Sequence, residues 1–290
     1  MQKEIWGDDM KKWLKLLMLT GLLSMPVGVL HVQAESAVAI SDNKDGTVSV
    51  EYDNTAGKKI AVMVVKEGTD KKYNYFSTDR KVDIDVPLTL GNGTYNVSVF
   101  KNISGTSYSS LHKEEVTLQL SDSKKAYLTS NQVINWNAKN SAIKKANSLT
   151  KKCKTEYSKI QKIYTYIVKN YHYDYVKLAQ NQSGQLTNYI PDIEVVYKQK
   201  KGICYDISAL NASMLRSLGI KTKLVKGYPV SKYYDGSVYH AWNRIYNKKN
   251  KKWIVVDATC DMCLYEQGAK FKLKNMEKKA SQYSRVTYEY

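Results

Sequence analysis

Three residues in the second half of the chain have the side chains and the order that thiol catalysis uses: Cys204, His240 and Asp257. A cysteine thiolate attacks a carbonyl carbon, a histidine accepts and returns the proton, and a carboxylate orients the imidazole. Each of these residue types alone is more often structural. The interpretation as a triad therefore depends on the elements that would bring the three side chains together.

Cys204 lies at the start of a predicted helix. The apolar residues after it recur at helical spacing, at Ile207, Leu210, Met214 and Leu215. Leu218-Gly219 then supplies a glycine stop. Unpaired backbone N–H groups and the positive end of the helix dipole favour a thiolate in the first turn. Gly202 would allow backbone or substrate to approach this turn closely.

His240 and Asp257 fall in two strand-like segments, residues 238–247 and 251–259. The sequence NKKNKK between them is suited to a hairpin loop. If the two segments pair as antiparallel neighbours, the imidazole and the carboxylate can lie side by side. A third strand is predicted at residues 221–228.

Two helices are predicted before Cys204, at residues 141–149 and 155–171. In the second helix Ile160, Ile163, Tyr164 and Ile167 form a stripe that should face the core. Helices followed by antiparallel strands are typical of an α+β domain, which we place at residues 121–290.

Residues 35–120 have a different pattern, that of short β-strands separated by turn signals. Within the segment TYNVSVF, Tyr95, Val97 and Val99 should share one buried face. About seven strands are expected, which is the count of a small immunoglobulin-like β-sandwich. Because no histidines, cysteines or carboxylates cluster here, we interpret this all-β domain as a spacer or a surface-binding module.

Residues 1–34 resemble a signal peptide. A basic segment precedes a mostly apolar run from Leu16 to Val32, and Val32-Gln33-Ala34 offers a cleavage-like site. Met10 is an alternative start. A membrane anchor is the competing interpretation, but a proline interrupts the run. We expect a secreted or extracellular protein with no stable membrane insertion after cleavage.

Charge is distributed unevenly: residues 35–120 carry a net charge of −2, and residues 121–290 carry +19. This asymmetry favours two domains with different surfaces. A lysine-rich surface is usually just solvated, and no nucleic-acid-binding motif is present. Attraction to an anionic cell-wall polymer is the second interpretation.

Residues 121–265 resemble the transglutaminase-like superfamily. The resemblance rests on GICYDISALNASMLRSLGIKTKLVKGY (202–228), YHAWNRIY (239–246) and WIVVDAT (253–259). It implies a papain-like α+β fold in which Cys204 is the nucleophile, His240 the general base and Asp257 the residue that orients His240. No acidic loop suited to calcium is found, so no metal and no cofactor are expected.

Three further cysteines, Cys153, Cys260 and Cys263, permit more than one arrangement. A single C-x-x-C pattern without a second ligand pair does not favour zinc. One structural disulfide is expected, either Cys260–Cys263 or Cys153 with one of them, and it would leave an odd thiol.

The sequence therefore predicts a secreted thiol enzyme that attacks an amide or peptide carbonyl and forms a thioester. Hydrolysis of a protein or cell-wall peptide is the favoured reaction. The alternatives are cross-linking by a protein-glutamine gamma-glutamyltransferase and a non-catalytic protein that binds the cell surface.

Overall fold

The computed structural model describes residues 37–186 and 188–290. The predicted signal peptide, residues 1–34, lies outside these residues. Within the described part of the chain, no helix combines the length and the apolar character needed to cross a membrane.

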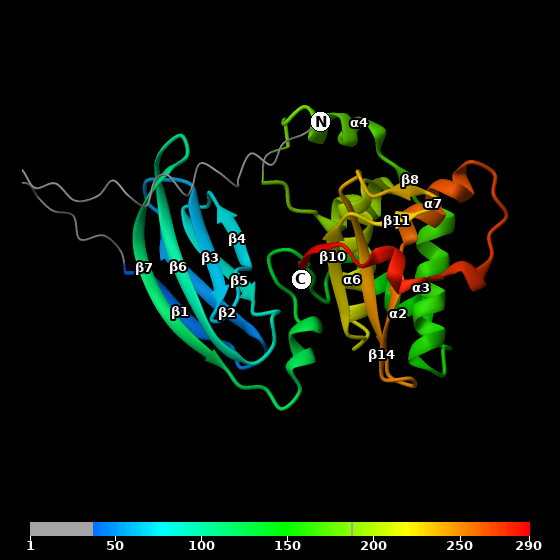
Figure 1. Cartoon of the computed structure of the whole chain (residues 1–290), viewed down its shortest axis with the longest axis horizontal. Helices are drawn as coiled ribbons and strands as arrows, with labels where there is room; N and C mark the ends of the chain where they lie inside the picture. Colours follow the sequence, from blue (N-terminus) through cyan, green and yellow to red (C-terminus); the bar gives the residue numbers. More distant parts are fainter. Residues whose placement is uncertain (1–36, 187) are drawn as a thin grey trace, which may run out of the picture. The chain divides into compact units, whose positions relative to one another are not determined.

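The N-terminal region consists of two antiparallel sheets (Figure 1). The strands of this region are β1 (Ala39–Asp42), β2 (Thr47–Asp53), β3 (Ile60–Lys66), β4 (Lys72–Ser77), β5 (Lys81–Pro87), β6 (Gly93–Ser104) and β7 (Ser107–Leu118). One sheet has the order β1-β2-β5 and the other the order β4-β3-β6-β7. The last strand, β7, is twelve residues long and pairs with β6.

Alternation of side chains builds the core of this region, as the sequence predicted. Tyr95, Val97 and Val99 on β6 are all buried. Val48 and Val50 on β2 and Val62 and Val64 on β3 are buried as well. The prediction of a small all-β region before the helices is therefore confirmed.

The C-terminal region combines six α-helices with an antiparallel sheet among the described residues (Figure 1). The helices are α2 (Ser141–Thr150), α3 (Glu156–Asn170), α4 (Tyr175–Gln182), α5 (Ile193–Gln199), α6 (Cys204–Arg216) and α7 (Ala258–Glu266). The sheet has the order β15 (Glu277–Lys278), β14 (Lys252–Val256), β13 (His240–Asn247), β10 (Thr222–Gly227) and β16 (Val286–Glu289).

Shorter elements connect these. They are the parallel pair β8 (His172–Tyr173) and β9 (Lys201–Gly202), the hairpin β11 (Val230–Ser231) and β12 (Tyr234–Asp235), and the 3₁₀ helices η1 (Ser123–Tyr127), η2 (Leu273–Asn275) and η3 (Ala280–Tyr283).

Helix α6 is the centre of the C-terminal region. It contacts strands β10 and β13 and helices α2, α3, α5 and α7 (Figure 1). From Asp206 to Arg216 every residue of α6 is buried. Helix α3, which begins at a capping box formed by Thr155 and Ser158, packs against α6 and buries its predicted stripe. The core therefore fixes the axis of the helix that begins at Cys204.

The strand expected at residues 251–259 is shorter than predicted. β14 ends at Val256, and Asp257 caps a new helix, α7, by accepting a hydrogen bond from the Cys260 backbone N–H at 3.0 Å. Helix α7 was not predicted, because its apolar residues are few and do not form a stripe. Helices α4 and α5 were not predicted either, and both are short.

Arg216 anchors the C-terminal end of α6. The residue is 2% exposed, and its guanidinium donates hydrogen bonds to three backbone carbonyls, those of Thr222 at 2.8 Å, Thr129 at 2.8 Å and Tyr290 at 2.9 Å. One side chain thus connects α6 to strand β10, to the segment that precedes α2, and to the last described residue.

We expect the substitution Arg216→Ala to lower the free energy of unfolding by about 3–5 kcal/mol, because three backbone carbonyls lose their donor and a cavity forms. Urea denaturation would measure this loss. The matched control is Lys249→Ala on the exposed β13–β14 loop, which should change stability by less than about 0.5 kcal/mol. A loss below about 1 kcal/mol for Arg216→Ala would contradict this role.

Candidate active site

The structure places His240 and Asp257 in direct contact. Strands β13 and β14 are antiparallel neighbours in which Asn243 lies opposite Val256, and this register brings the start of β13 next to the residue after β14. The Nε2 atom of His240 lies 2.9 Å from Oδ2 of Asp257, and both side chains are buried, at 5% and 0% exposed. The pairing expected from the hairpin is present.

Two tyrosines that the sequence analysis did not single out also contact Asp257. Tyr283 on η3 donates its hydroxyl to Oδ2 at 2.9 Å, and Tyr234 on β12 donates to the same oxygen at 3.3 Å. The Tyr234 hydroxyl also lies 3.1 Å from Nε2 of His240. Burial, together with the charge of Asp257, raises the pKa of both tyrosines, so both hydroxyls keep their protons. No periodicity identifies these tyrosines in the sequence.

The charges of this pair stabilise each other. Burial alone would lower the pKa of His240, but the charges of Asp257 and Cys204 raise it to about 10. Burial alone would raise the pKa of Asp257, but His240 and the donors around the carboxylate lower it below its ordinary value. The imidazole is therefore held as an imidazolium beside a carboxylate near neutral pH.

Cys204 is the first residue of α6 and is partly exposed. Its charge and a side-chain hydrogen bond both raise the pKa of His240, so the two side chains are neighbours. Nε2 of His240 faces Asp257, so Nδ1 is the ring nitrogen that does not contact this carboxylate. The three residues predicted from the sequence therefore occupy one site.

The turn before Cys204 is shaped by Gly202 and Asp206. A Cβ atom at Gly202 would lie 2.5 Å from the Cβ of Asp206, so this position tolerates only glycine. Asp206 is 0% exposed and accepts the Ile203 backbone N–H at 2.9 Å, which caps the helix. The close approach expected at Gly202 is thus made by a side chain of the same helix.

Asp206 also connects the first turn of α6 to α4. Its carboxylate accepts Lys177 Nζ at 3.0 Å and the hydroxyl of Tyr189. Lys177 in turn donates to Tyr189 at 3.0 Å. These contacts connect α4 and the segment after it to the turn that begins at Cys204.

Tyr173 on β8 is a further neighbour of Cys204. It lies beside Gly202, its register partner on β9. Burial, followed by the charge of Cys204, raises the pKa of Tyr173, whereas a hydrogen bond from the Cys204 backbone N–H lowers it. The Tyr173 hydroxyl therefore keeps its own proton near neutral pH.

All four cysteines are free thiols, so none of the disulfides considered from the sequence is present. Cys260 and Cys263 lie one turn apart on α7. Burial raises the pKa of both to about 12, which disfavours their thiolates. Among the described residues, no group of three or more His, Cys, Asp or Glu side chains could hold a metal ion.

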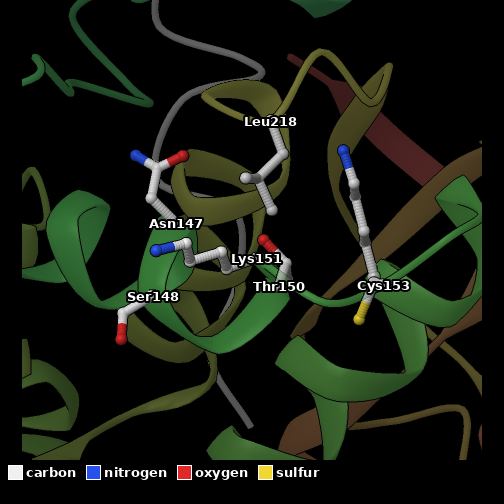
Figure 2. A pocket seen from close by; sticks show the side chains of 7 residues that line it. Asn147, Ser148, Thr150, Lys151, Cys153 and Leu218 are labelled. Atoms are coloured by element: carbon white, nitrogen blue, oxygen red, sulfur yellow. The ribbon is translucent and has the colours of Figure 1, made fainter.

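The surface hollow shown in Figure 2 is separate from this site. Its volume is about 490 Å³, and it lies between the end of α2 and Leu218; none of the three triad residues lines it. Cys153 borders this hollow, and its sulfur lies 3.7 Å from the Ser158 carbonyl; among the described residues it makes no hydrogen bond to a histidine or a carboxylate. This second thiol therefore lacks the partners that Cys204 has.

Comparison with known proteins gives a family for this region. Residues 143–258 match the sequence profile of the transglutaminase-like superfamily, and this segment contains Cys204, His240 and Asp257. The family assignment supports a thiol enzyme in general terms. No curated protein matches the chain.

Several solved structures are similar to the chain at low identity. A candidate cysteine protease from Cytophaga hutchinsonii shares 16% identity at a TM-score of 0.38, over 70% of this chain and 74% of that one. A candidate protease from Parabacteroides distasonis shares 16% at 0.34, over 69% and 38%. Red sea bream transglutaminase shares 12% at 0.29, over 79% and 53%.

We expect the His240–Asp257 pair to make stability depend on pH. Because the pKa of His240 is raised in the folded chain to about 10, its contribution is complete below its ordinary pKa of about 6.5 and is lost as pH rises through about 10. The stability advantage of the wild-type chain over His240→Gln should therefore shrink between pH 6 and pH 10, measured by urea denaturation.

The control for this measurement is His112→Gln, which changes an exposed histidine on β7. It should keep the wild-type dependence on pH. An advantage over His240→Gln that stays constant up to pH 10 would mean that the imidazole is neutral in the folded chain.

Proposed function

We propose that the chain is a secreted thiol enzyme that hydrolyses amide or peptide bonds in a protein or a cell-wall peptide. The observation that supports this best is the buried His240–Asp257 pair, 2.9 Å apart, beside the partly exposed Cys204. A buried ion pair is costly to form, and a structural role alone would not require a thiol beside it.

In the first half of the proposed reaction, the Cys204 thiolate attacks the amide carbonyl carbon. The carbonyl π electrons move to oxygen, and the Tyr173 hydroxyl, which keeps its proton near neutral pH, donates to this oxyanion. Nδ1 of the His240 imidazolium then gives its proton to the leaving nitrogen as the C–N bond breaks. The products of this half are an amine and a thioester on Cys204.

In the second half, neutral His240 takes a proton from water, and the resulting hydroxide attacks the thioester carbonyl. The C–S bond breaks, the sulfur leaves as a thiolate, and the product is a carboxylic acid, which loses its proton to water and is released as a carboxylate. Asp257 stays ionised throughout and holds the imidazole in position, as Tyr234 and Tyr283 hold Asp257.

Substitution of the triad tests this proposal. Cys204→Ala and His240→Ala should each lower kcat by roughly 10⁴-fold or more, because the thiolate and its proton partner act as a unit. Asp257→Asn should retain measurable activity, since the amide oxygen can still cap α7. The assay is mass spectrometry of a peptide library and purified cell wall incubated with the protein.

Alkylation by iodoacetamide near pH 7 gives a readout that needs no substrate. Cys204 should react faster than Cys153, the partly exposed thiol that serves as the internal control, and His240→Ala should remove this difference. Equal rates at the two thiols would favour the alternative of a non-catalytic surface-binding protein.

The choice of water as acyl acceptor rests on the composition of the domain. Residues 121–290 contain 28 lysines, and many of them, such as Lys248 and Lys249, are exposed. Exposed glutamines, including Gln180 on α4, would be donors on the same domain. An enzyme that passed acyl groups freely to lysine would cross-link itself, whereas a hydrolase avoids this.

The acceptor can be tested directly. When the protein is incubated with a glutamine-containing protein and a fluorescent amine, we expect ammonia or cleaved peptide to be released without incorporation of the amine. The matched control is Cys204→Ala. Fluorescent incorporation and high-mass ladders that disappear in this variant would instead support the cross-linking alternative.

Export is part of the same proposal and rests on the sequence of residues 1–34. N-terminal sequencing of protein recovered from the culture medium should find a chain that begins after Ala34. Retention by an anionic wall polymer would follow from the net charge of +19 on residues 121–290 and would weaken as salt is added.

A further inference from the structure

Lys226 is a partly buried cation close to Cys204, the candidate nucleophile. The proposed reaction does not use Lys226. It lies on the central strand β10, where its register partners are Ala241 on β13 and Tyr288 on β16. The next residue on β10, Gly227, is the register partner of His240. Lys226 therefore lies at the end of the sheet where the triad assembles.

The ammonium group of Lys226 is held by aromatic rings. Its Nζ atom lies 3.5 Å from the ring centroid of Tyr205, the residue directly after Cys204, and 5.4 Å from that of Tyr290. The charges of Lys226 and Cys204 also interact. Because Tyr205 belongs to the first turn of α6, the ammonium lies beside the same turn as the thiol.

Lys226 has no carboxylate partner among residues 37–186 and 188–290, and it makes no hydrogen bond through its ammonium there. Two other partly buried lysines of the same region are paired with carboxylates, Lys177 with Asp206 at 3.0 Å and Lys223 with Glu289 at 2.7 Å, whereas Lys200 donates to tyrosine hydroxyls. Burial lowers the pKa of Lys226 to about 8. A partly buried ammonium without a counter-ion is costly, and an anion that bound it would recover part of that cost.

We propose that Lys226 binds a carboxylate of the substrate next to the amide that Cys204 attacks, so that the enzyme selects acidic peptides. This inference rests on the proposed function for its reaction, but the binding of a carboxylate beside the thiol can be measured without turnover. The net charge of +19 on residues 121–290 would draw anionic peptides toward this region of the chain.

Cation–π contacts suit this role. The rings of Tyr205 and Tyr290 hold the ammonium in place without neutralising it, so its full charge is available to a ligand. A lysine ammonium acts as a point charge and does not demand the two-pronged geometry of a guanidinium. A single carboxylate on a flexible peptide is therefore the ligand class that fits.

The test compares two alkylating reagents that differ only in charge, iodoacetate and iodoacetamide, on the full mature chain. Both react with the Cys204 thiolate, and mass spectrometry of the Cys204 peptide reports each rate. At pH 6.5 the ratio of the iodoacetate rate to the iodoacetamide rate should fall at least about tenfold in Lys226→Met, which keeps the length of the side chain. Lys226→Arg should retain most of the ratio.

Lys249→Met is the matched control, because it removes one positive charge from the exposed loop of the same sheet. It should keep the wild-type ratio. An equal fall in Lys226→Met and Lys249→Met would assign the effect to net charge, and an unchanged ratio in Lys226→Met would overturn the proposal.

The pH dependence of the wild-type ratio gives a second measurement that needs no variant. The ratio should fall as pH rises through about 8, where Lys226 loses its proton. Burial raises the pKa of Tyr205 and Tyr290, the rings that face Lys226, so both stay neutral. The charge of Cys204 is common to both reagents and cancels. A fall centred near 10 would point to His240 instead and would contradict the role of Lys226.

With a substrate in hand, peptides that carry Asp or Asn beside the scissile amide separate the two proposals. If peptides are hydrolysed with no preference for Asp, the selection by Lys226 is wrong and the thiol hydrolase stands. If no amide is hydrolysed but the alkylation ratio still depends on Lys226, the carboxylate site stands and the proposed reaction is wrong.

Discussion

The buried contact between His240 and Asp257 is the interaction on which the arrangement of the site depends. Two charged groups at 5% and 0% exposure are stable in the interior only when each is paired and its remaining hydrogen-bonding atoms are satisfied. Asp257 meets this requirement with four donors: the imidazole, the Cys260 backbone N–H, and the hydroxyls of Tyr234 and Tyr283. Each donor comes from a different element, so the pair holds β12, β13, α7 and η3 in register around one carboxylate.

This requirement explains why the chain beyond the triad contributes to the site. Tyr283 belongs to η3, and β16, the next element in the chain, pairs with β10 at the edge of the sheet. The last described residue, Tyr290, is held by Arg216 through its carbonyl and contacts Lys226 through its ring. The C-terminal segment thus serves both the orientation of Asp257 and the surroundings of the thiol. Contacts with the β-sandwich reach the same segment, since Tyr73 packs edge-on against Tyr288 and Tyr290.

Both local and tertiary interactions determine the electrostatic surroundings of the first turn of α6. The helix dipole and free N–H groups favour an anion there, yet Asp206 already places a carboxylate two residues after Cys204. That carboxylate is occupied by the Ile203 N–H and by Lys177 and Tyr189, so its charge is neutralised locally. The positive groups left to act on the thiolate are therefore His240 and Lys226, and only the first was evident in the sequence.

The sequence by itself determined the elements with strong periodicity. Alternation fixed the core strands of the sandwich, helical spacing fixed α3 and α6, and the hairpin between β13 and β14 followed from two strand-like segments around NKKNKK. The sequence also predicted that Cys204, His240 and Asp257 lie together, because a first-turn cysteine and two paired strands are local patterns. Helix α7 was not predicted, because it has no apolar stripe. Helices α4 and α5 were not predicted either, and both are short. Only the tertiary structure decided the roles of Tyr234, Tyr283 and Lys226: tyrosines and lysines are abundant in this chain, and what distinguishes these three is the carboxylate or the rings that long-range packing brings to them.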